Sequence, residues 1–265
     1  MIIRENTQKV SMPVNIFEKY KMDSIAYFDI ETTGFKKEED NIILISLGWY
    51  INQESFNIKQ YYAENLYEEK ELLNAFGKDI EGFATWCSYN GLAFDEPFIK
   101  FRFQKNNLQY DVPNKHIDLY RLIRPYYKQL GIDRCNLKTV EKFIGIERED
   151  TIDGGLSVEL YNKYLQTSSE DLKEKIMLHN YEDVLNLPQI FHLIYKVDNS
   201  EEITRVDAIT EKQKRYLSFL MEKNNIKIDK KLKKISKKAA SKIIDSILKG
   251  TVDNDKLEDI IKNSY

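Results

Sequence analysis

The sequence lacks any apolar run of about 20 residues, the length that a membrane-spanning helix needs. Its N-terminus carries no apolar segment typical of a signal peptide. The two cysteines, Cys87 and Cys135, have neither metal-ligand spacing nor a disulfide pattern, which favours a reducing compartment. Histidine is also scarce, with three in 265 residues, so a histidine-rich zinc site is not expected. We therefore expect a cytoplasmic protein without membrane contact.

Charge is distributed unevenly along the chain, although the net charge is only -3. Residues 208–249 hold 13 Lys or Arg against 4 Asp or Glu, whereas residues 1–207 hold 25 against 35. A polar, turn-prone stretch, Asp198–Glu202, lies near this change of composition. The sequence thus predicts a main domain over 1–197, a linker over 198–207, and a basic helical module with an acidic tail over 208–265.

Apolar patterning predicts the elements of the main domain. Strands are predicted at 24–31, 42–50, 56–63 and 83–89, and the first two are nearly continuous apolar runs, typical of strands buried in the middle of a sheet. Helical patterns occur at 66–82, 95–106, 119–130, 136–144, 156–166 and 169–194. Residues 1–22 show no clear period, and two amphipathic helices are expected at 210–224 and 233–249. This order indicates a layered α/β fold with a mixed sheet flanked by helices, followed by a small α-helical module.

Two acids end the first predicted strand, in the sequence Tyr27-Phe28-Asp29-Ile30-Glu31-Thr32-Thr33-Gly34. Residues i and i+2 of a strand point to the same face, so the carboxylates of Asp29 and Glu31 would converge. The repulsion between two such carboxylates is relieved when one of them has a raised pKa or when both bind a hard cation. The alternative is a surface strand end that happens to carry acids.

A third acid, Asp95, follows an Asn90-Gly91 turn after the strand at 83–89. We expect Gly91 to let the chain leave the sheet sharply, because glycine tolerates a positive φ. Asp95 would then start a helix that faces the strand ends. Its alternative role is that of a helix N-cap. Asp118, after a short apolar stretch, either approaches the same place or caps the helix that follows.

The fourth acid, Asp183, lies in the last long helix of the main domain, beside an apolar face. An acid on the buried side of a helix is rare unless it has a partner. His179 is one helical turn before it, on the same side. The alternative is a solvated His–Asp pair on the helix surface.

Taken in order, these motifs resemble those of the DEDD superfamily of 3′→5′ exonucleases, which have a ribonuclease H-like fold. The resemblance covers about residues 23–195, and Asp29–Phe35 is its most specific part. Segments His116–Leu119, Leu137–Glu141 and Gly155-Leu156 are similar to a bacterial ribonuclease H-like nuclease branch. One departure concerns the ring residue of the third motif. In the best-known subgroups it is a Tyr four residues before the Asp or a His five before it, whereas His179 lies four before Asp183.

The resemblance implies hydrolysis of phosphodiester bonds with two divalent cations, Mg²⁺ or Mn²⁺, held by oxygen ligands. It implies that Asp29 bridges both metals, that Glu31 and Asp183 complete the site that activates water, and that Asp95 holds the second metal. His179 would orient or deprotonate the attacking water.

The resemblance also implies contacts to the terminal nucleotide from Thr32, Thr33 and the backbone near Gly34. Phe35, Asn90 and Phe94 would line its base or sugar, although the two phenylalanines are equally compatible with a core role. The main domain is acidic, so phosphate binding would rely on a local basic rim. Its candidates are Arg102, Lys105, Arg121, Arg124, Lys128, Arg134 and Lys138.

The function implied is a 3′→5′ exonuclease that acts on the 3′ end of single-stranded DNA or RNA, with DNA favoured. The alternatives are a ribonuclease or a structure-specific endonuclease with the same site, and a non-catalytic nucleic-acid-binding module. The charge of residues 208–249 suits nucleic-acid tethering, while a solvated Lys-rich helical hairpin is the other interpretation.

Overall fold

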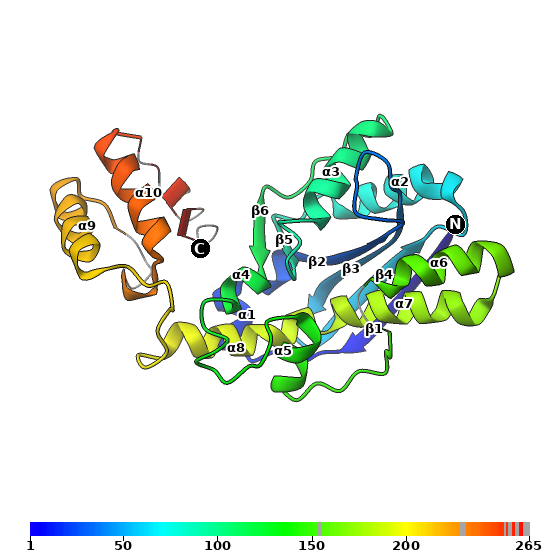
Figure 1. Cartoon of the computed structure of the whole chain (residues 1–265), viewed down its shortest axis with the longest axis horizontal. Coiled ribbons are helices and arrows are strands. Elements are labelled where there is room, and N and C mark those ends of the chain that lie inside the picture. Colours follow the sequence, from blue (N-terminus) through cyan, green and yellow to red (C-terminus); the bar gives the residue numbers. More distant parts are fainter. Residues whose placement is uncertain (153–154, 228–231, 252, 254–255, 258–259, 262–265) are drawn as a thin grey trace. The chain divides into compact units, whose positions relative to one another are not determined.

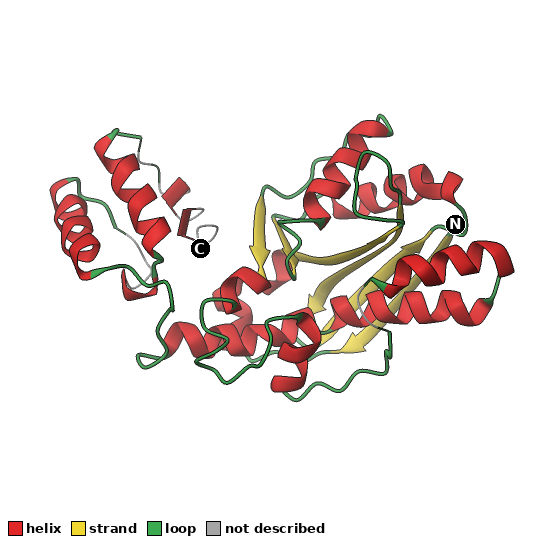
Figure 2. Cartoon of the chain, viewed as in Figure 1, coloured by secondary structure: helices red, strands yellow, loops and turns green. Residues whose placement is uncertain are grey.

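The structure is a computed structural model that describes residues 1–152, 155–227, 232–251, 253, 256–257 and 260–261. The main domain contains a six-stranded sheet in the order β1-β4-β3-β2-β5-β6 (Figure 2). The strands are β1 (Ile2–Lys9), β2 (Ile25–Thr32), β3 (Ile42–Asn52), β4 (Ser55–Tyr62), β5 (Thr85–Ser88) and β6 (Lys115–Asp118). β1, β4, β3 and β2 pair antiparallel, whereas β2, β5 and β6 pair parallel. The predicted mixed α/β fold is confirmed.

Helices cover both faces of this sheet (Figure 1). Alternate residues of β2, such as Phe28 and Ile30, pack in one apolar cluster with α2 (Glu69–Ile80) and α3 (Asp95–Lys105). Residues of β3 and β4 pack in another cluster with α6 (Leu156–Thr167) and α7 (Glu170–Leu185). Because side chains alternate along a strand, Asp29 and Glu31 point away from the face that Phe28 and Ile30 occupy.

Three features of the main domain differ from the prediction. Residues 1–22 contain β1 and the helix α1 (Val14–Tyr20), which precedes a 3₁₀ turn, η1 (Met22–Ser24). β1 is an edge strand with mostly exposed side chains, so it carries no apolar pattern to recognise. The helix predicted at 169–194 is two helices, α7 and α8 (Leu187–Asn199), and Pro188 in the first turn of α8 has no N–H to continue α7. The predicted helix at 119–130 is only the short α4 (Leu119–Ile123).

The chain divides into two compact units, Met1–Leu119 with Glu141–His192, and Tyr120–Val140 with Leu193–Tyr265. α5 (Leu137–Phe143) begins in the second and ends in the first. The division predicted from composition, at residues 197 and 207, follows other boundaries and stays a prediction.

In the second unit, α9 (Glu211–Lys223) and α10 (Lys237–Leu248) share an apolar cluster that includes Leu217, Leu220, Ile243 and Ile247. Thr210 and Gln213 form a capping box at the start of α9. Ser236 accepts a hydrogen bond from the backbone N–H of Ala239 at the start of α10, after the 3₁₀ turn η3 (Leu232–Lys234). Both predicted helices are therefore present.

Within the part of the chain that the structure describes, no helix is both long enough and apolar enough to cross a membrane.

Candidate active site

The end of β2 carries Asp29 and Glu31 on one face, as the strand period requires. Burial, and next the negative charge of Asp183, raise the pKa of Asp29 well above its usual range. The same two causes raise the pKa of Glu31 to about 8. Asp95 adds repulsion to both carboxylates. Folding therefore holds a group of acids together against their mutual repulsion.

Asp95 reaches β2 from the first residue of α3. Its Oδ1 accepts a hydrogen bond from the backbone N–H of Ile30 over 3.2 Å. β5 pairs with β2 only as far as Tyr27, so this N–H has no strand partner on that side. Burial raises the pKa of Asp95 to about 7. The N-cap alternative is wrong, because Phe94 holds the cap position and makes no side-chain cap bond.

The Asn90-Gly91 turn that leads to Asp95 is built differently from the expectation. Asn90 takes the left-handed conformation, with φ +71°, and Gly91 does not. Glycine is needed at position 91 because a Cβ there would lie 2.3 Å from the hydroxyl of Ser88. Buried Asp118, at the end of β6, accepts from the backbone N–H groups of Asn90 at 2.9 Å and Leu92 at 3.4 Å. Asp118 thus fixes the turn that precedes Asp95.

α7 brings His179 and Asp183 to the same place. The Nε2 atom of His179 lies 3.5 Å from Asp183 Oδ2 and 3.8 Å from Glu31 Oε1. Among the described residues, Glu31, His179 and Asp183 form a group whose candidate ligand atoms all lie within 4.8 Å of one another. Carboxylates alone were expected as ligands, whereas this group also includes an imidazole nitrogen.

These side chains fit a divalent cation. Carboxylate oxygens are the ligands that Mg²⁺ and Mn²⁺ prefer, and imidazole is tolerated better by Mn²⁺ and later transition metals. A cation would also offset the repulsion that raises the pKa values of Asp29 and Glu31.

Several supporting residues escaped the sequence analysis. Buried Asn180, next to His179, donates from Nδ2 to Asp29 Oδ2 over 2.7 Å. Arg148 donates to Asp183 Oδ1 over 2.5 Å and to the backbone carbonyl of His179 over 3.2 Å. Asp150 Oδ2 lies 2.7 Å from His179 Nδ1. The sequence offered one clue to Asn180, its position between His179 and Asp183 in the third motif. It offered none to Arg148 and Asp150, which lie in an irregular loop, residues 146–152, without hydrophobic periodicity.

Arg148 is surrounded by carboxylates. Besides Asp183, its guanidinium lies within 3.5 Å of Glu141 and Glu182 and within 3.9 Å of Asp150. Burial nevertheless raises the pKa of Glu141 to about 7, against the opposing effect of the Arg148 charge. Because Arg148 binds Asp183 Oδ1, the Oδ2 atom is the one that faces His179.

The residues expected to contact a nucleotide lie in the two turns beside the acids. The Thr32 hydroxyl donates to the carbonyl of Gly34 over 2.6 Å, and the Thr33 hydroxyl accepts from the Asn41 N–H over 2.9 Å. At Gly34 a Cβ would lie 2.5 Å from a carboxylate oxygen of Asp40. Both threonine side chains therefore help to shape the turn after β2.

Phe35 and Phe94 differ in burial. Phe35 is 80% exposed, whereas Phe94 is partly buried and packs against the core cluster that contains Phe98. Their ring centroids lie 6.1 Å apart in an edge-on arrangement. The core alternative thus suits Phe94 but not Phe35.

The prediction that Arg102 belongs to the basic rim is wrong. Arg102 is buried, with 3% exposure, and binds Glu69 through two nitrogens. It therefore stabilises the packing of α3 on α2 and is not available to a phosphate. Lys105 is exposed and donates to the carbonyl of Glu38. Arg121, Arg124, Lys128, Arg134 and Lys138 lie in the other compact unit.

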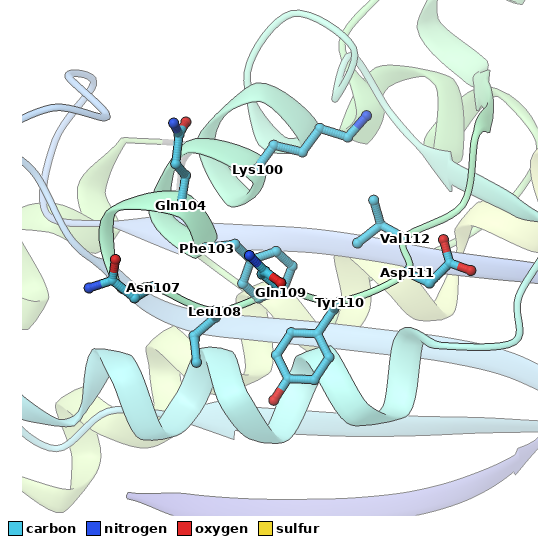
Figure 3. Close-up of a pocket in the computed structure, with 9 residues that line it drawn as sticks. All are labelled: Lys100, Phe103, Gln104, Asn107, Leu108, Gln109, Tyr110, Asp111 and Val112. Carbon is cyan, nitrogen blue, oxygen red and sulfur yellow. The ribbon is translucent and has the colours of Figure 1, made fainter.

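A hollow of about 750 Å³ lies elsewhere, along α3 and the loop after it (Figure 3). Lys100, Phe103, Tyr110 and Val112 are among its lining residues, and none of the acids described above belongs to it. The acids meet at the strand ends and not in this hollow.

The comparison with sequence families agrees with the fold. Residues 26–195 match the family RNase_H_2, described as RNase_H superfamily, and this range is more than half of the chain. The chain belongs to the RNase_H superfamily. This superfamily is one of nucleases, so the ribonuclease H-like part of the resemblance is confirmed, while the DEDD 3′→5′ exonuclease subgroup stays a prediction.

The individual proteins and structures that resemble this chain have low sequence identity to it. Uncharacterized protein YprB of Bacillus subtilis (strain 168) is 29% identical over 182 residues, 67% of this chain and 44% of that protein. The chain thus spans less than half the length of this relative. A family B DNA polymerase of the hyperthermophilic archaeon Pyrobaculum calidifontis has a TM-score of 0.50 and 15% identity, over 84% of this chain and 26% of the polymerase. This likeness is one of fold. An E. coli ExoI–ssDNA complex has a TM-score of 0.36 and 13% identity, over 66% and 43% of the two chains.

Proposed function

We propose that this RNase_H-superfamily chain is a metal-dependent 3′→5′ exonuclease that hydrolyses single-stranded nucleic acid, with DNA favoured over RNA. The observation that carries the proposal is the meeting of Asp29, Glu31, Asp95 and Asp183, whose charges act on one another, with the Nε2 atom of His179 facing two of them.

In this proposal the four acids would hold two divalent cations, Mg²⁺ or Mn²⁺. Such cations supply an activated water and neutralise charge on the phosphoryl oxygens and the leaving oxygen. Asp29 accepts a hydrogen bond from Asn180 of α7, and Asp95 binds the backbone N–H of the next residue, Ile30, so Asp29 would suit a ligand shared by both sites. Glu31 and Asp183 flank His179, and Asp95 serves the second site. His179 accepts the proton of the attacking water at Nε2.

The turns on either side of the acids suit the 3′-terminal nucleotide. The backbone at Thr32, Thr33 and Gly34 contacts its sugar and phosphate, and Asn90 contacts its sugar edge. Exposed Phe35 stacks on the terminal base, supported from the side by Phe94. Stacking on an aromatic face is tolerant of sequence, as a general exonuclease requires.

The experiment that tests the function follows 5′-labelled single-stranded DNA and RNA oligomers with Mn²⁺, Mg²⁺ or EDTA, beside the variant Asp29→Asn. A metal-dependent ladder that shortens from the 3′ end, absent in the variant, supports the exonuclease and gives the preferred sugar. Cleavage at internal positions would favour the endonuclease alternative. Binding without any cleavage, under all metals, would favour the non-catalytic binding module.

We also propose that the basic helical module tethers the same nucleic acid through one face of α9. Lys212, Tyr216, Phe219 and Lys223 follow one another at helical spacing, with Arg215 beside them. Tyr216 and Phe219 are 44% and 57% exposed, whereas the neighbouring residues Leu217 and Leu220 are buried in the apolar cluster shared with α10. Cations interleaved with exposed aromatic rings suit phosphates and unpaired bases.

A further inference from the structure

Residues 146–152, after α5, are fastened to α7 beside the acids, although no motif marks this stretch in the sequence. The carboxylate of Glu182 accepts from the backbone N–H groups of Glu149 at 3.0 Å and Asp150 at 2.8 Å. This contact places the side chain of Asp150 against His179, where Oδ2 and Nδ1 lie 2.7 Å apart. The Asp150 side chain is 1% exposed and that of His179 is 5% exposed. Water therefore does not compete for this hydrogen bond.

The geometry decides which imidazole nitrogen faces the site. A neutral imidazole has one N–H and one lone pair, and the nitrogen bonded to a carboxylate is the one that keeps the proton. With Asp150 on Nδ1, the lone pair of His179 lies at Nε2, which faces Glu31 and Asp183. A lone pair that faces two carboxylates suits a water or cation between them.

We propose that Asp150 is the positioning residue of the site: it fixes the ring orientation and tautomer of His179, so that Nε2 accepts the proton of the attacking water. The role of Nε2 as proton acceptor rests on the proposed function. The effect of Asp150 on the orientation and tautomer of His179 does not depend on that function.

Asp150 also makes a local hydrogen bond, which offers a second explanation for why its side chain is buried in the loop. Its Oδ1 accepts from the backbone N–H of Ile152 over 2.8 Å, a turn within the loop. If this turn were its whole role, Asp150 would affect the stability of the loop and not the proton position on His179. The two roles therefore differ in what they predict for His179.

The first test is the two-bond ¹⁵N–¹H spectrum of the imidazoles at pH above about 8, with Mg²⁺ present. The chain has three histidines, so the signals are assigned by replacing them singly. We expect His179 protonated at Nδ1 in the wild type, and a mixed or reversed tautomer in Asp150→Asn, whose amide N–H₂ turns toward the ring. Protonation at Nε2 in the wild type, or an unchanged spectrum in the variant, would overturn the proposal.

The second test is a double-mutant cycle on hydrolysis. Asp150→Asn should lower kcat about 10- to 100-fold with little change in KM, and Asp150→Glu should recover part of the loss. In a His179→Phe background, Asp150→Asn should cause no further loss. Equal losses in both backgrounds would mean that Asp150 does not act through His179. Glu149→Gln, which removes a charge from an exposed neighbour, is the matched control.

The two tests separate this inference from the function it rests on. If the wild type hydrolyses nothing while the spectrum shows the expected tautomer change, the proposed function fails and the positioning role of Asp150 stands. If hydrolysis occurs and the spectrum is unaffected by Asp150→Asn, the positioning role fails alone. Should Asp150→Asn unfold, the wild-type spectrum and Asp150→Glu still decide between the outcomes.

Discussion

Asn180 Nδ2 donates to Asp29 Oδ2 over 2.7 Å, which joins α7 directly to the end of β2. The Oδ1 atom of Asn180 in turn accepts from the hydroxyl of Ser46 in β3, and Gln60 of β4 donates to the same hydroxyl over 3.0 Å. All three polar side chains are buried. The orientation of Asp29 is therefore set by a chain of hydrogen bonds that crosses three strands and one helix.

Replacing Asn180 by alanine should lower kcat by more than the accompanying loss of folded protein can explain. Removal of the hydrogen bond frees Asp29 to rotate and leaves buried polar groups without partners, which costs about 1–3 kcal/mol of unfolding free energy. We expect kcat to fall about 10- to 100-fold, as when a supporting hydrogen bond behind a metal ligand is removed. The control is Asn57→Ala, a buried amide of β4 bonded to Thr7 and Glu5. A similar loss of activity in the control would contradict the specific role of Asn180.

Asp29→Asn and Asp183→Asn should each abolish hydrolysis and keep the fold. Amides lack the charge that holds a divalent cation, so the rate should drop by at least about 1,000-fold. In metal-free protein, Asp29→Asn should raise the melting temperature, because it removes a carboxyl group that must either take up a proton or carry a charge beside three other acids when the protein folds. A rate within about 100-fold of the wild type in either variant would refute the two-metal assignment. A lowered metal-free melting temperature would contradict the electrostatic argument.

The stability of the metal-free protein should fall as pH rises from about 4.5 to about 8. The folded-state pKa values of Glu31, about 8, and Asp95, about 7, lie above those of the unfolded chain. At a pH between the unfolded and the folded pKa of such a group, the folded protein binds more protons than the unfolded chain does. The stability that the group contributes is therefore complete below its unfolded pKa and is lost as the pH approaches its folded pKa. Glu141, with a pKa of about 7, acts in the same direction.

Thermal melts across this pH range with EDTA, and again with Mn²⁺, measure the effect. Mn²⁺ should restore stability most strongly near pH 8, where it replaces the missing protons. A metal-free melting temperature that does not change with pH would show that the acids are not held together as described.

Phe35→Ala should weaken binding of the terminal nucleotide without destabilising the protein. Phe35 is 80% exposed, so little apolar area is lost from the core, whereas a stacked base contributes about 1–3 kcal/mol. KM should therefore rise about 5- to 100-fold at a nearly unchanged melting temperature. Tyr67→Ala, which removes an aromatic ring that is 96% exposed, is the control and should leave KM as it was. An unchanged KM in Phe35→Ala would remove Phe35 from the site.

Some of this site was predictable from sequence because the residues involved are close along the chain. Asp29 and Glu31 sit on one strand and His179 and Asp183 on one helix, so periodicity alone places each pair on a common face. The order of motifs also predicted that β2, the Asn90 turn and α7 would meet. The centre of the sheet was also predictable locally, since β2 and β3 each carry a long apolar run.

The roles of the supporting residues were not predictable, because they depend on tertiary contacts, even for Asn180, which lies next to a motif residue. Asp150 lies 29 residues from His179, and Asn180 lies 151 from Asp29. Arg102 shows the opposite error: a cation beside the acids in sequence looked available to phosphate, yet it is buried against Glu69. Sequence gives the type of a charged residue, whereas only packing decides whether it faces water.

Neutralising the basic face of α9 should weaken binding of single strands in a salt-dependent way. Each phosphate that a cation no longer neutralises changes the slope of log K against log salt by about 0.7 for single strands, so Lys212→Ala, Arg215→Ala and Lys223→Ala together should reduce the slope by about 2. The measurement is fluorescence anisotropy with a long labelled strand in the Asp29→Asn background, which prevents cleavage. Lys70→Ala, Lys78→Ala and Lys163→Ala, three exposed positions of the other compact unit, remove the same charge as a control. Replacing Tyr216 and Phe219 by alanine should weaken binding at high salt as well, because base stacking does not depend on counterion release. Equal slopes for the basic-face variant and the wild type would leave α9 as a solvated helix without a role in tethering.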